Sequence, residues 1–588
     1  MNLSWYWRRA RRMSAGEIAS KVGRIAAGPI RLRALRIVQR PPTLSPGRAI
    51  PFEGKDPAEL SSPELLAEAE KLLAGDRKVL GLGWLGPSQW DWCMDPGSGY
   101  RWPLVPSYRL QYRKANTEIR LCWELNRFHD ICTLSMAYYV TRDPRYVQAV
   151  RRTVDEWIHA NPAGMGPNWV SAMEAAIRIV NITWAAKLTS PSGDADLHGA
   201  FAWLISVHVR FVRMWLSTGS SANNHLLIEL MGLICAGAYW SSAAGRLGHW
   251  TTRYVEELTR QTGPEGMNKE MSSHYHLLVC ESAFHVRSAL QVTGAEDATL
   301  NRLFQSMVNV VDALSLSGGM CAFGDDDGGE IVRIPSKTGR WDQWLTGVAL
   351  TPWLHGDSSA TRGSKNTKLL RVANYDGIVV VSTRVLRVVV DGAAHGLEPL
   401  YAHGHDDSGS IYVGIGDYWF VIDPGTYSYF GDSHVRAYFR SALAHNGPRR
   451  VDLVQDLHDA FMWDEPPQKP SVKVVFDAAQ VVVTIGARTW TRTVTCTETT
   501  VAVQDTVQGP RESVVRLTVD PSWRTTKSTT EWFHSIDDDV RVGLEVPRGT
   551  VSRIATPFSG TFGAVETLES VLISGVGEII WTVDARAS

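Results

Sequence analysis

Apolar side chains between about residues 56 and 355 recur every three or four positions, the spacing of amphipathic helices. One series consists of Leu125, Phe128, Cys132, Met136 and Tyr139. Asp143-Pro144 ends this series, and further series run to Asn161-Pro162 and from Met173 to Trp184. Helices of this length with short Pro- or Gly-bearing connections predict antiparallel pairs, which in series fit a toroid or a solenoid.

Beyond residue 365 the period of the apolar pattern changes to two. Val472, Val474 and Phe476 alternate with other residues, and the same alternation recurs in 481–485 and 515–519. Short alternating strands with Gly and Asp turns predict an antiparallel β-sandwich. The small, polar stretch 356–364 is typical of a linker. We therefore expect a multi-domain chain, all-α and then all-β, with a helical domain at 56–360 and a β-sandwich at 365–588.

The first 55 residues form a separate basic segment. Residues 1–40 contain ten Lys and Arg but only one acid, Glu17. Ser14 and Glu17 have the spacing of a capping box, and Ile18, Val22 and Ile25 follow at helical spacing. Such a basic amphipathic helix can lie on an anionic membrane or bind an anionic polymer. Alternatively, it docks on the next domain and leaves its basic face in solvent.

Composition excludes several classes of protein. The 60 Lys and Arg balance 61 Asp and Glu, a net charge of -1, which argues against a nucleic-acid-binding protein. The seven scattered Cys suggest buried free thiols rather than a disulfide framework. The sequence shows no secretory signal and no apolar run long enough to span a membrane. These features predict a cytoplasmic protein.

Candidate chemistry concentrates in three polar clusters. The first is Ser220–Leu227 with Asn223-Asn224-His225, and the second is Lys269–His276 with Tyr275 between two His. An N-cap explains the first equally well, and a packed Tyr the second. The third joins His403-Gly404-His405 with Asp423 and His445. His-x-His on a strand would place both imidazoles on one face, and His405, Asp423 and His445 are ligand types suited to zinc.

In this order the three clusters resemble the heparinase II/III-like polysaccharide lyases. The resemblance also covers Trp90-Asp91-Trp92, Tyr100–Pro103, Cys122–Arg127, and Asn168-Trp169 with Glu174 and Arg178. It implies an incomplete (α/α) toroid followed by an antiparallel β-sandwich. It also implies cleavage of a uronate-containing polysaccharide by β-elimination.

The resemblance also implies roles for individual residues. Asn224 and His225 would neutralise the substrate carboxylate, Tyr275 would be the catalytic acid and often also the base, and His403 would contact substrate. His405, Asp423 and His445 would hold a structural Zn²⁺, with no redox or nucleotide cofactor. If Tyr275 is also the base, its pKa must fall from about 10 toward 7. Further residues that could contact the polymer are Glu124, Trp169, Arg178 and Arg440.

Three other functions remain open from the sequence. A uronyl C5-epimerase would use the same intermediate and reprotonate it on the opposite face. A non-catalytic glycan-binding protein of a polysaccharide assembly system would not need Asn224, His225, Tyr275 and His403 together. A glycoside hydrolase would need two carboxylates, for which Asp406, Asp407 and Glu124 are available. The Asp-rich stretch Gly324–Gly329 lacks the terminal Glu of a calcium loop and predicts a turn that closes the helical domain.

Overall fold

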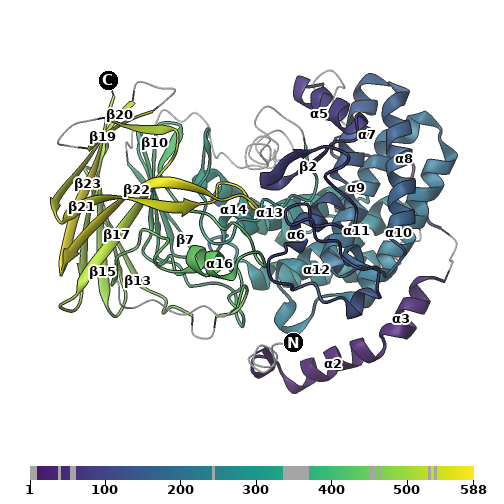
Figure 1. Cartoon of the computed structure of the whole chain (residues 1–588), viewed down its shortest axis with the longest axis horizontal. Coiled ribbons are helices and arrows are strands. Elements are labelled where there is room, and N and C mark those ends of the chain that lie inside the picture. The colour runs from purple at the N-terminus through teal and green to yellow at the C-terminus, as the bar shows by residue number, and fades with distance from the viewer. Residues whose placement is uncertain are drawn as a thin grey trace.

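The computed structural model describes residues 9–37, 41–52, 61–241, 246–334, 370–450, 459–463, 466–526, 531–535 and 540–587. The predicted linker 356–364 lies outside these residues, as do the predicted domain ends at 360 and 365. Those boundaries therefore stay predictions. Figure 1 shows a helical domain and a strand-rich domain side by side, with two N-terminal helices along the outside of the helical domain.

The helical domain consists of two rows of helices, an inner and an outer one, and successive helices along the chain alternate between the rows. The inner row is α7 (His129–Thr141), α9 (Ala172–Thr189), α11 (Asn224–Tyr239) and α13 (Ser273–Gln291). The outer row is α8 (Pro144–Ala160), α10 (Ala195–Trp215), α12 (Leu247–Gln261) and α14 (Ala298–Leu314). The shorter α5 (Pro63–Leu73) packs on α7 and α8, and α6 (Ile119–Leu125) precedes α7. Inner α9 is buried along its whole length, whereas outer α8 buries one face, which explains their different apolar patterns.

One predicted helix is two helices in the structure. The apolar series from Leu125 to Tyr139 spans the end of α6 and most of α7. Phe128 between them has a left-handed backbone, with φ of 67°, so a single helix over this range was wrong. The periodicity continues across the break because Leu125, Phe128 and Cys132 are all buried.

The strand-rich domain is a sandwich of two antiparallel sheets. The first follows the order β21-β22-β17-β11-β10-β9-β8-β7, with β12 (Arg449–Arg450) also paired to β17. Its strands are β7 (Arg371–Tyr375), β8 (Ile378–Ser382), β9 (Leu386–Asp391), β10 (Ile411–Ile415), β11 (Tyr418–Ile422), β17 (Glu512–Val519), β21 (Thr550–Phe558) and β22 (Glu566–Val576). The second follows the order β13-β14-β15-β16-β23-β20-β19-β18. Its strands are β13 (Ser471–Phe476), β14 (Val481–Gly486), β15 (Trp490–Cys496), β16 (Thr500–Val507), β18 (Trp523–Thr526), β19 (Glu531–Ser535), β20 (Val540–Arg548) and β23 (Glu578–Ala587).

The central strands of the first sheet, such as β8 and β10, are buried on both faces and thereby join the two domains. Val379 and Val381 of β8 point into the sandwich core. Ile378 and Val380 of the same strand point the other way, into a core shared with Val310 of α14. The continuous apolar run of β8 reflects this double burial, whereas β14 alternates because one face is less buried. The toroid-then-sandwich architecture expected from the sequence is confirmed.

Residues 9–37 form an N-terminal arm that contains α2 (Ala15–Ala26) and α3 (Gly28–Leu35). Ser14 caps α2 as predicted, because its side chain accepts a hydrogen bond from the Glu17 amide at 3.1 Å. Arg24 donates to the Leu216 carbonyl at 2.7 Å, and Arg31 donates to the Met214 carbonyl at 2.6 Å. The arm therefore docks with charged side chains against the helical domain, the reverse of the docking considered from the sequence.

Two other expectations concern burial and membranes. All seven Cys are buried and free of disulfides, as predicted. Across the described residues, no helix is both long and apolar enough to cross a membrane.

Candidate functional site

The three polar clusters meet where the helical domain faces the sandwich. Asn223 caps α11, so that Asn224 and His225 begin the helix, and Ser272 caps α13 three residues before Tyr275. His403 comes from the segment between β9 and β10. Two helix N-termini and one loop of the sandwich domain therefore supply the residues expected to be catalytic.

Glu270 links Asn224 to His403. The Asn224 side-chain amide donates to both Glu270 carboxylate oxygens at 3.0 Å. The Asn224 backbone amide also donates to Glu270 Oε1 at 2.9 Å, and Glu270 Oε2 lies 3.5 Å from His403 Nε2. The His403 ring in turn stacks on the Tyr275 ring with 3.7 Å between centroids. We call Asn224, His225, Glu270, Tyr275 and His403 the central cluster.

The Tyr275 hydroxyl lies between a carboxylate and a second phenol. It donates to Asp327 Oδ2 at 3.1 Å and lies 2.8 Å from the Tyr429 hydroxyl. Burial, followed by the Asp327 charge, raises the pKa of Tyr275 well above its usual value. This direction is opposite to the lowered pKa that Tyr275 would need as a base, and it favours a hydroxyl that stays protonated. Burial and then His403 lower the pKa of His225 to about 4, so that His225 is neutral at pH 7.

Asp325 connects the central cluster to the predicted metal ligands. Its Oδ2 lies 3.0 Å from His403 Nδ1, and its Oδ1 lies 2.8 Å from His405 Nε2. Arg436 of α16 (Ser433–Arg440) binds both oxygens of this fully buried carboxylate. One carboxylate thus orients both imidazoles of the His-x-His motif.

The His-x-His motif itself lies in a loop and not on a strand, so the predicted strand was wrong. Its glycine is required by a close approach, since a β-carbon at Gly404 would lie 1.8 Å from the His395 carbonyl oxygen. The shared partner Asp325, rather than strand pleating, brings His403 and His405 together.

His274 adds a positive charge beside Tyr275. Its Nδ1 lies 3.2 Å from Asp326 Oδ1, and its Nε2 lies 3.2 Å from Asp327 Oδ1. Burial opposes protonation, but Asp326 and Asp327 outweigh it and raise the pKa of His274 to about 9. Arg120 also binds Asp327, at 2.9 Å, so the carboxylate next to Tyr275 is held by two cations.

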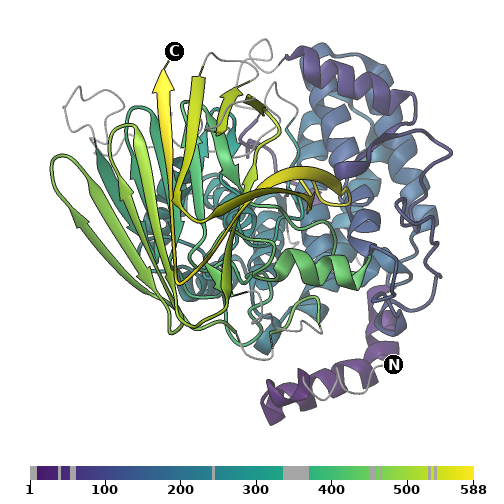
Figure 2. The same cartoon turned by 60° about the vertical axis from the view of Figure 1, so that its left-hand side comes forward.

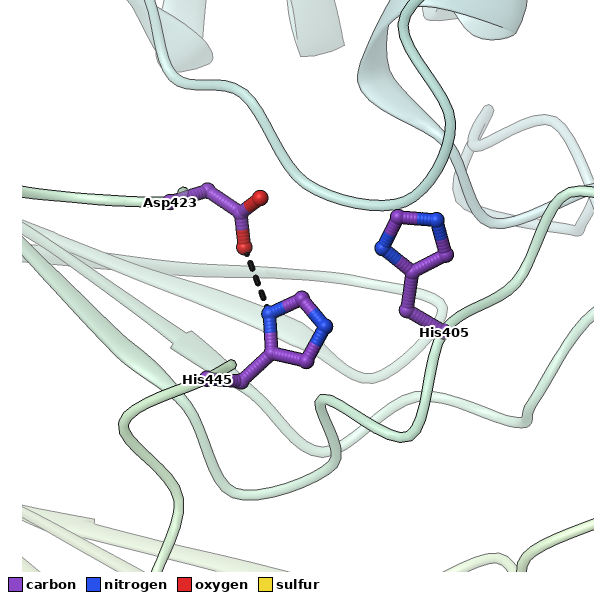
Figure 3. A group of neighbouring side chains, drawn as sticks. All are labelled: His405, Asp423 and His445. Carbon is purple, nitrogen blue, oxygen red and sulfur yellow. Dashed lines mark hydrogen bonds and ion pairs between the residues drawn. The ribbon is translucent and has the colours of Figure 1, made fainter. Parts of the chain in front are cut away.

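His405, Asp423 and His445 form a compact buried triad. One potential ligand atom from each lies within 4.8 Å of the others, and His445 Nδ1 lies 2.8 Å from Asp423 Oδ2. Figure 3 shows His405 facing this bonded pair. His405 Nδ1 and His445 Nε2 are buried without a hydrogen-bond partner, as expected of atoms that bind a cation. The triad fits a divalent metal, and Asp325 at His405 Nε2 is the outer carboxylate that such ligands commonly have.

The four residues expected to contact the polymer are all buried, at most 3% exposed. Glu124 pairs with Arg120 and Arg333, and Trp169 packs against Trp157. Arg178 donates to the Asn168 carbonyl and contacts His208, while Arg440 donates to the Asp459 carbonyl. Substrate contact by Glu124, Trp169, Arg178 and Arg440 stays a prediction. Arg440 Nε and Nη2 are buried without a hydrogen-bond partner.

Several residues around Tyr275 and His403 were not singled out from the sequence. They are Glu270, Asp325, Asp327, Tyr429 and Arg436. Asp325 and Asp327 belong to the Asp-rich stretch that predicted only a turn. The available signal was the number of adjacent acids beside glycines. The partners of Asp325 lie 78 to 111 residues away in sequence, and those of Asp327 lie 52 to 207 residues away.

Comparisons with known proteins agree with this arrangement. The N-terminal heparinase II/III family model matches residues 87–315, and the heparinase II/III-like C-terminal model matches 364–448. The chain belongs to the heparinase II/III-like polysaccharide lyase family. The family expected from the sequence is confirmed, and the expected enzyme class agrees with it. No curated protein matches this heparinase II/III-like chain significantly in sequence.

Solved structures with the same fold are distant in sequence. A heparinase III is 14% identical, with a TM-score of 0.66, and the match covers 95% of this chain and 89% of that one. A heparan sulfate lyase mutant from Pedobacter heparinus is 15% identical, with a TM-score of 0.54, and the match covers 96% and 88%. At this identity the likeness shows a shared toroid-and-sandwich fold.

Proposed function

We propose that this heparinase II/III-like protein cleaves a uronate-containing polysaccharide by β-elimination. The observation that carries the proposal is the stacking of Tyr275 on His403 at 3.7 Å, within a cluster that also holds Asn224 and His225. In the reaction a base removes the C5 proton, negative charge builds on the C6 carboxylate, and the C4–O bond breaks. The departing oxygen takes a proton from an acid.

Tyr275 is the proposed acid. Its raised pKa keeps the hydroxyl protonated, so that it can deliver a proton to the leaving oxygen. The proton acceptor at C5 is then another neutral base, and His225, which stays neutral at pH 7, has the required state. His403 is proposed to orient the sugar against the Tyr275 ring.

Asn224 has one amide N–H that Glu270 does not hold. Its side-chain nitrogen lies 3.0 Å from both Glu270 oxygens, which one shared N–H explains, and its carbonyl oxygen is buried without a partner. The second N–H is proposed to stabilise charge on the C6 carboxylate. A donor aimed at developing charge is worth about 2.7–4 kcal/mol in comparable sites. Tyr275 and His403 are 5% and 4% exposed, so the polymer reaches them only if covering chain moves.

We further propose that His405, Asp423 and His445 hold a structural Zn²⁺. Nitrogen and carboxylate ligands suit zinc, which would fix the loop that carries His403. The ion is placed here as a support for that loop and not as a participant in bond cleavage.

The test is a panel of uronate polysaccharides followed by ultraviolet absorbance, which detects the unsaturated uronate product. We expect absorbance to rise with at least one polymer. Tyr275→Phe retains the ring and removes the proton donor, so turnover is expected to fall by about 10²–10⁴. Tyr254→Phe removes another buried phenol, on α12 (Leu247–Gln261) and outside the central cluster, and is the matched control.

Two results would contradict the proposal. Undiminished turnover of a folded Tyr275→Phe variant would exclude Tyr275 as the acid. A flat panel combined with deuterium incorporation at C5 in deuterated water would indicate epimerisation instead of elimination.

A further inference from the structure

The N-terminal arm exposes much of its apolar surface, while several of its charged side chains contact the rest of the protein. Among the described residues, its large exposed hydrophobics are Ile18, Val22, Ile25, Ile30 and Ile37, of which Ile30 is 74% exposed and Val22 61%. The α2 residues Ile18, Val22 and Ile25 are spaced four and three apart and share one helix face. A helix that only covered the helical domain would bury this face.

The charged side chains of the arm hold it in this orientation. Arg9 lies 3.2 Å from the hydroxyls of Ser220 and Ser221, and Arg12 donates to the Pro399 carbonyl at 2.7 Å. Glu17 accepts a hydrogen bond from the Ser220 amide at 3.1 Å. With Arg24 and Arg31, these contacts run along the whole inner side of the arm and fix which face points outward.

A neighbouring loop extends the exposed apolar surface. Leu104 is 50% exposed, and Val105 is also exposed. A β-carbon at Gly28 of α3 would lie 2.8 Å from the ring of Tyr108, and one at Gly164 would lie 2.4 Å from Leu32 of α3. Because Gly164 accepts a hydrogen bond from the Ser107 amide, the 103–108 loop lies against α3. Figure 2 shows the arm projecting at the edge of the molecule.

The charge around this surface is positive. Arg33 and Arg36 of the arm are exposed, as are Arg109 and Lys114 beyond the loop. Glu17 is the one acid in residues 9–37, and residues 101–114 contain none. The Glu17 carboxylate is already engaged by Ser220 and Lys21. Aliphatic side chains bordered by cations therefore form this face, with no exposed acid among them.

We propose that this face, made by the arm and the 103–108 loop, docks the protein on the surface of a membrane that contains anionic lipid. Isoleucine, valine and leucine insert into the boundary between headgroups and acyl chains, while arginine and lysine contact lipid phosphates. A polysaccharide fits less well, because sugar faces stack on aromatic rings rather than on branched aliphatic chains. The inference does not depend on the proposed lyase reaction.

The test is co-sedimentation of the full chain with vesicles of phosphatidylcholine alone and with mixed vesicles of phosphatidylcholine and phosphatidylglycerol. We expect binding to the mixed vesicles, weakened by high salt, and little binding to phosphatidylcholine. The triple variant Ile18→Ser, Val22→Ser, Ile25→Ser is expected to lower the vesicle partition coefficient at least roughly tenfold. Arg33→Gln with Arg36→Gln is expected to lower it roughly fivefold for each charge.

The matched control is Val475→Ser with Phe476→Ser, which removes two exposed hydrophobics of β13. It is expected to bind vesicles as the unchanged protein does, and circular dichroism verifies that every variant folds. Absence of binding by the unchanged protein, or equal binding by the triple variant, would overturn the proposal. It would also be overturned by a concentration-dependent dimer without vesicle binding that the triple variant abolishes, because a second copy then covers this face.

Discussion

Globular proteins usually bury apolar side chains and expose charged ones. The central cluster departs from this rule by burying charges, and the N-terminal arm departs from it by exposing apolar side chains. Around Tyr275, ionised groups such as Asp325 and Asp327 are buried between the two domains. In the arm, Val22 and Ile30 are exposed while Arg24 and Arg31 contact the protein. Buried charges are costly unless they are paired, and exposed apolar patches are typical of interaction surfaces.

The two regions differ in whether groups of the same chain offset the energetic cost. Each buried acid of the site has cationic or imidazole partners within hydrogen-bond distance, for example Asp325 with Arg436 and His403. The exposed apolar residues of the arm have no such local compensation. The buried charges of the site are therefore paired by groups of the same chain. The exposed apolar face of the arm indicates a binding partner outside the chain.

The largest expected effect comes from removing Asp325. Asp325→Ala leaves the charge of buried Arg436 without its carboxylate partner. The free energy of unfolding should therefore fall by about 3–5 kcal/mol. Urea denaturation measures this change. The double variant Asp325→Ala, Arg436→Met removes the unpaired charge and should recover part of the loss. A change below about 1 kcal/mol in the single variant would show that the pair is not structurally important.

Raising the pH should lower the stability of the folded protein by deprotonating His274. Because its pKa is raised to about 9, its stabilising contribution is complete below the ordinary pKa of about 6.5 and is lost as pH rises through 9. Asp326, Asp327, Arg120, Glu281 and Glu330 are the charged or titratable groups that act on it. The loss is at most about 3 kcal/mol, read from thermal unfolding at successive pH values. His274→Gln should flatten the curve between pH 7 and 10, and an unchanged curve would contradict this assignment.

Metal removal should have a smaller effect that depends on ion concentration. With zinc at about a hundred times its Kd, binding stabilises the folded chain by about 2.7 kcal/mol, which a chelator removes. Elemental analysis should find zinc in the unchanged protein and not in His445→Ala. His434→Ala removes an exposed imidazole of α16 and is the control, which should retain the zinc. Equal metal content in all three proteins would contradict the site.

The smallest effect is expected in the arm. Val22→Ser removes an exposed methyl pair, so the free energy of unfolding should change by less than about 0.5 kcal/mol. Turnover of a short, freely dissolved oligosaccharide should also be unchanged. Thermal unfolding and an initial-rate assay check both expectations. A large loss of stability would mean that Val22 packs against the chain rather than facing outward.

Much of the fold was predictable from local patterns. Helical and strand periodicities identified α8, α9, β14 and β17. The pattern is clear in α8 and β14 because each alternates between a buried and a less buried face. The break at Phe128 was missed because its left-handed backbone leaves the apolar pattern intact. The orientation of the arm was missed because an amphipathic sequence does not say which of its faces meets protein.

The site was predictable only in part, for a reason of distance along the chain. Tyr275, His403 and the triad were singled out through the resemblance to a known family, from the short motifs that contain them. Asp325 and Arg436 have no local motif, and only folding brings them together from 111 residues apart. The pKa of Tyr275 also depends on Asp327 and on burial, neither of which the sequence displays. The roles of these residues stay predictions until variants are measured.

Glu118 has a consequence for how the protein acquires activity during synthesis. This buried carboxylate caps α6 through the Arg120 amide and also accepts hydrogen bonds from the amides of Tyr429 and Phe430. Tyr429 is the residue whose phenol meets Tyr275. Tyr275 therefore meets this partner only after a further 154 residues have been synthesised. Recovery of activity during refolding should thus report the docking of the two halves rather than the folding of either one.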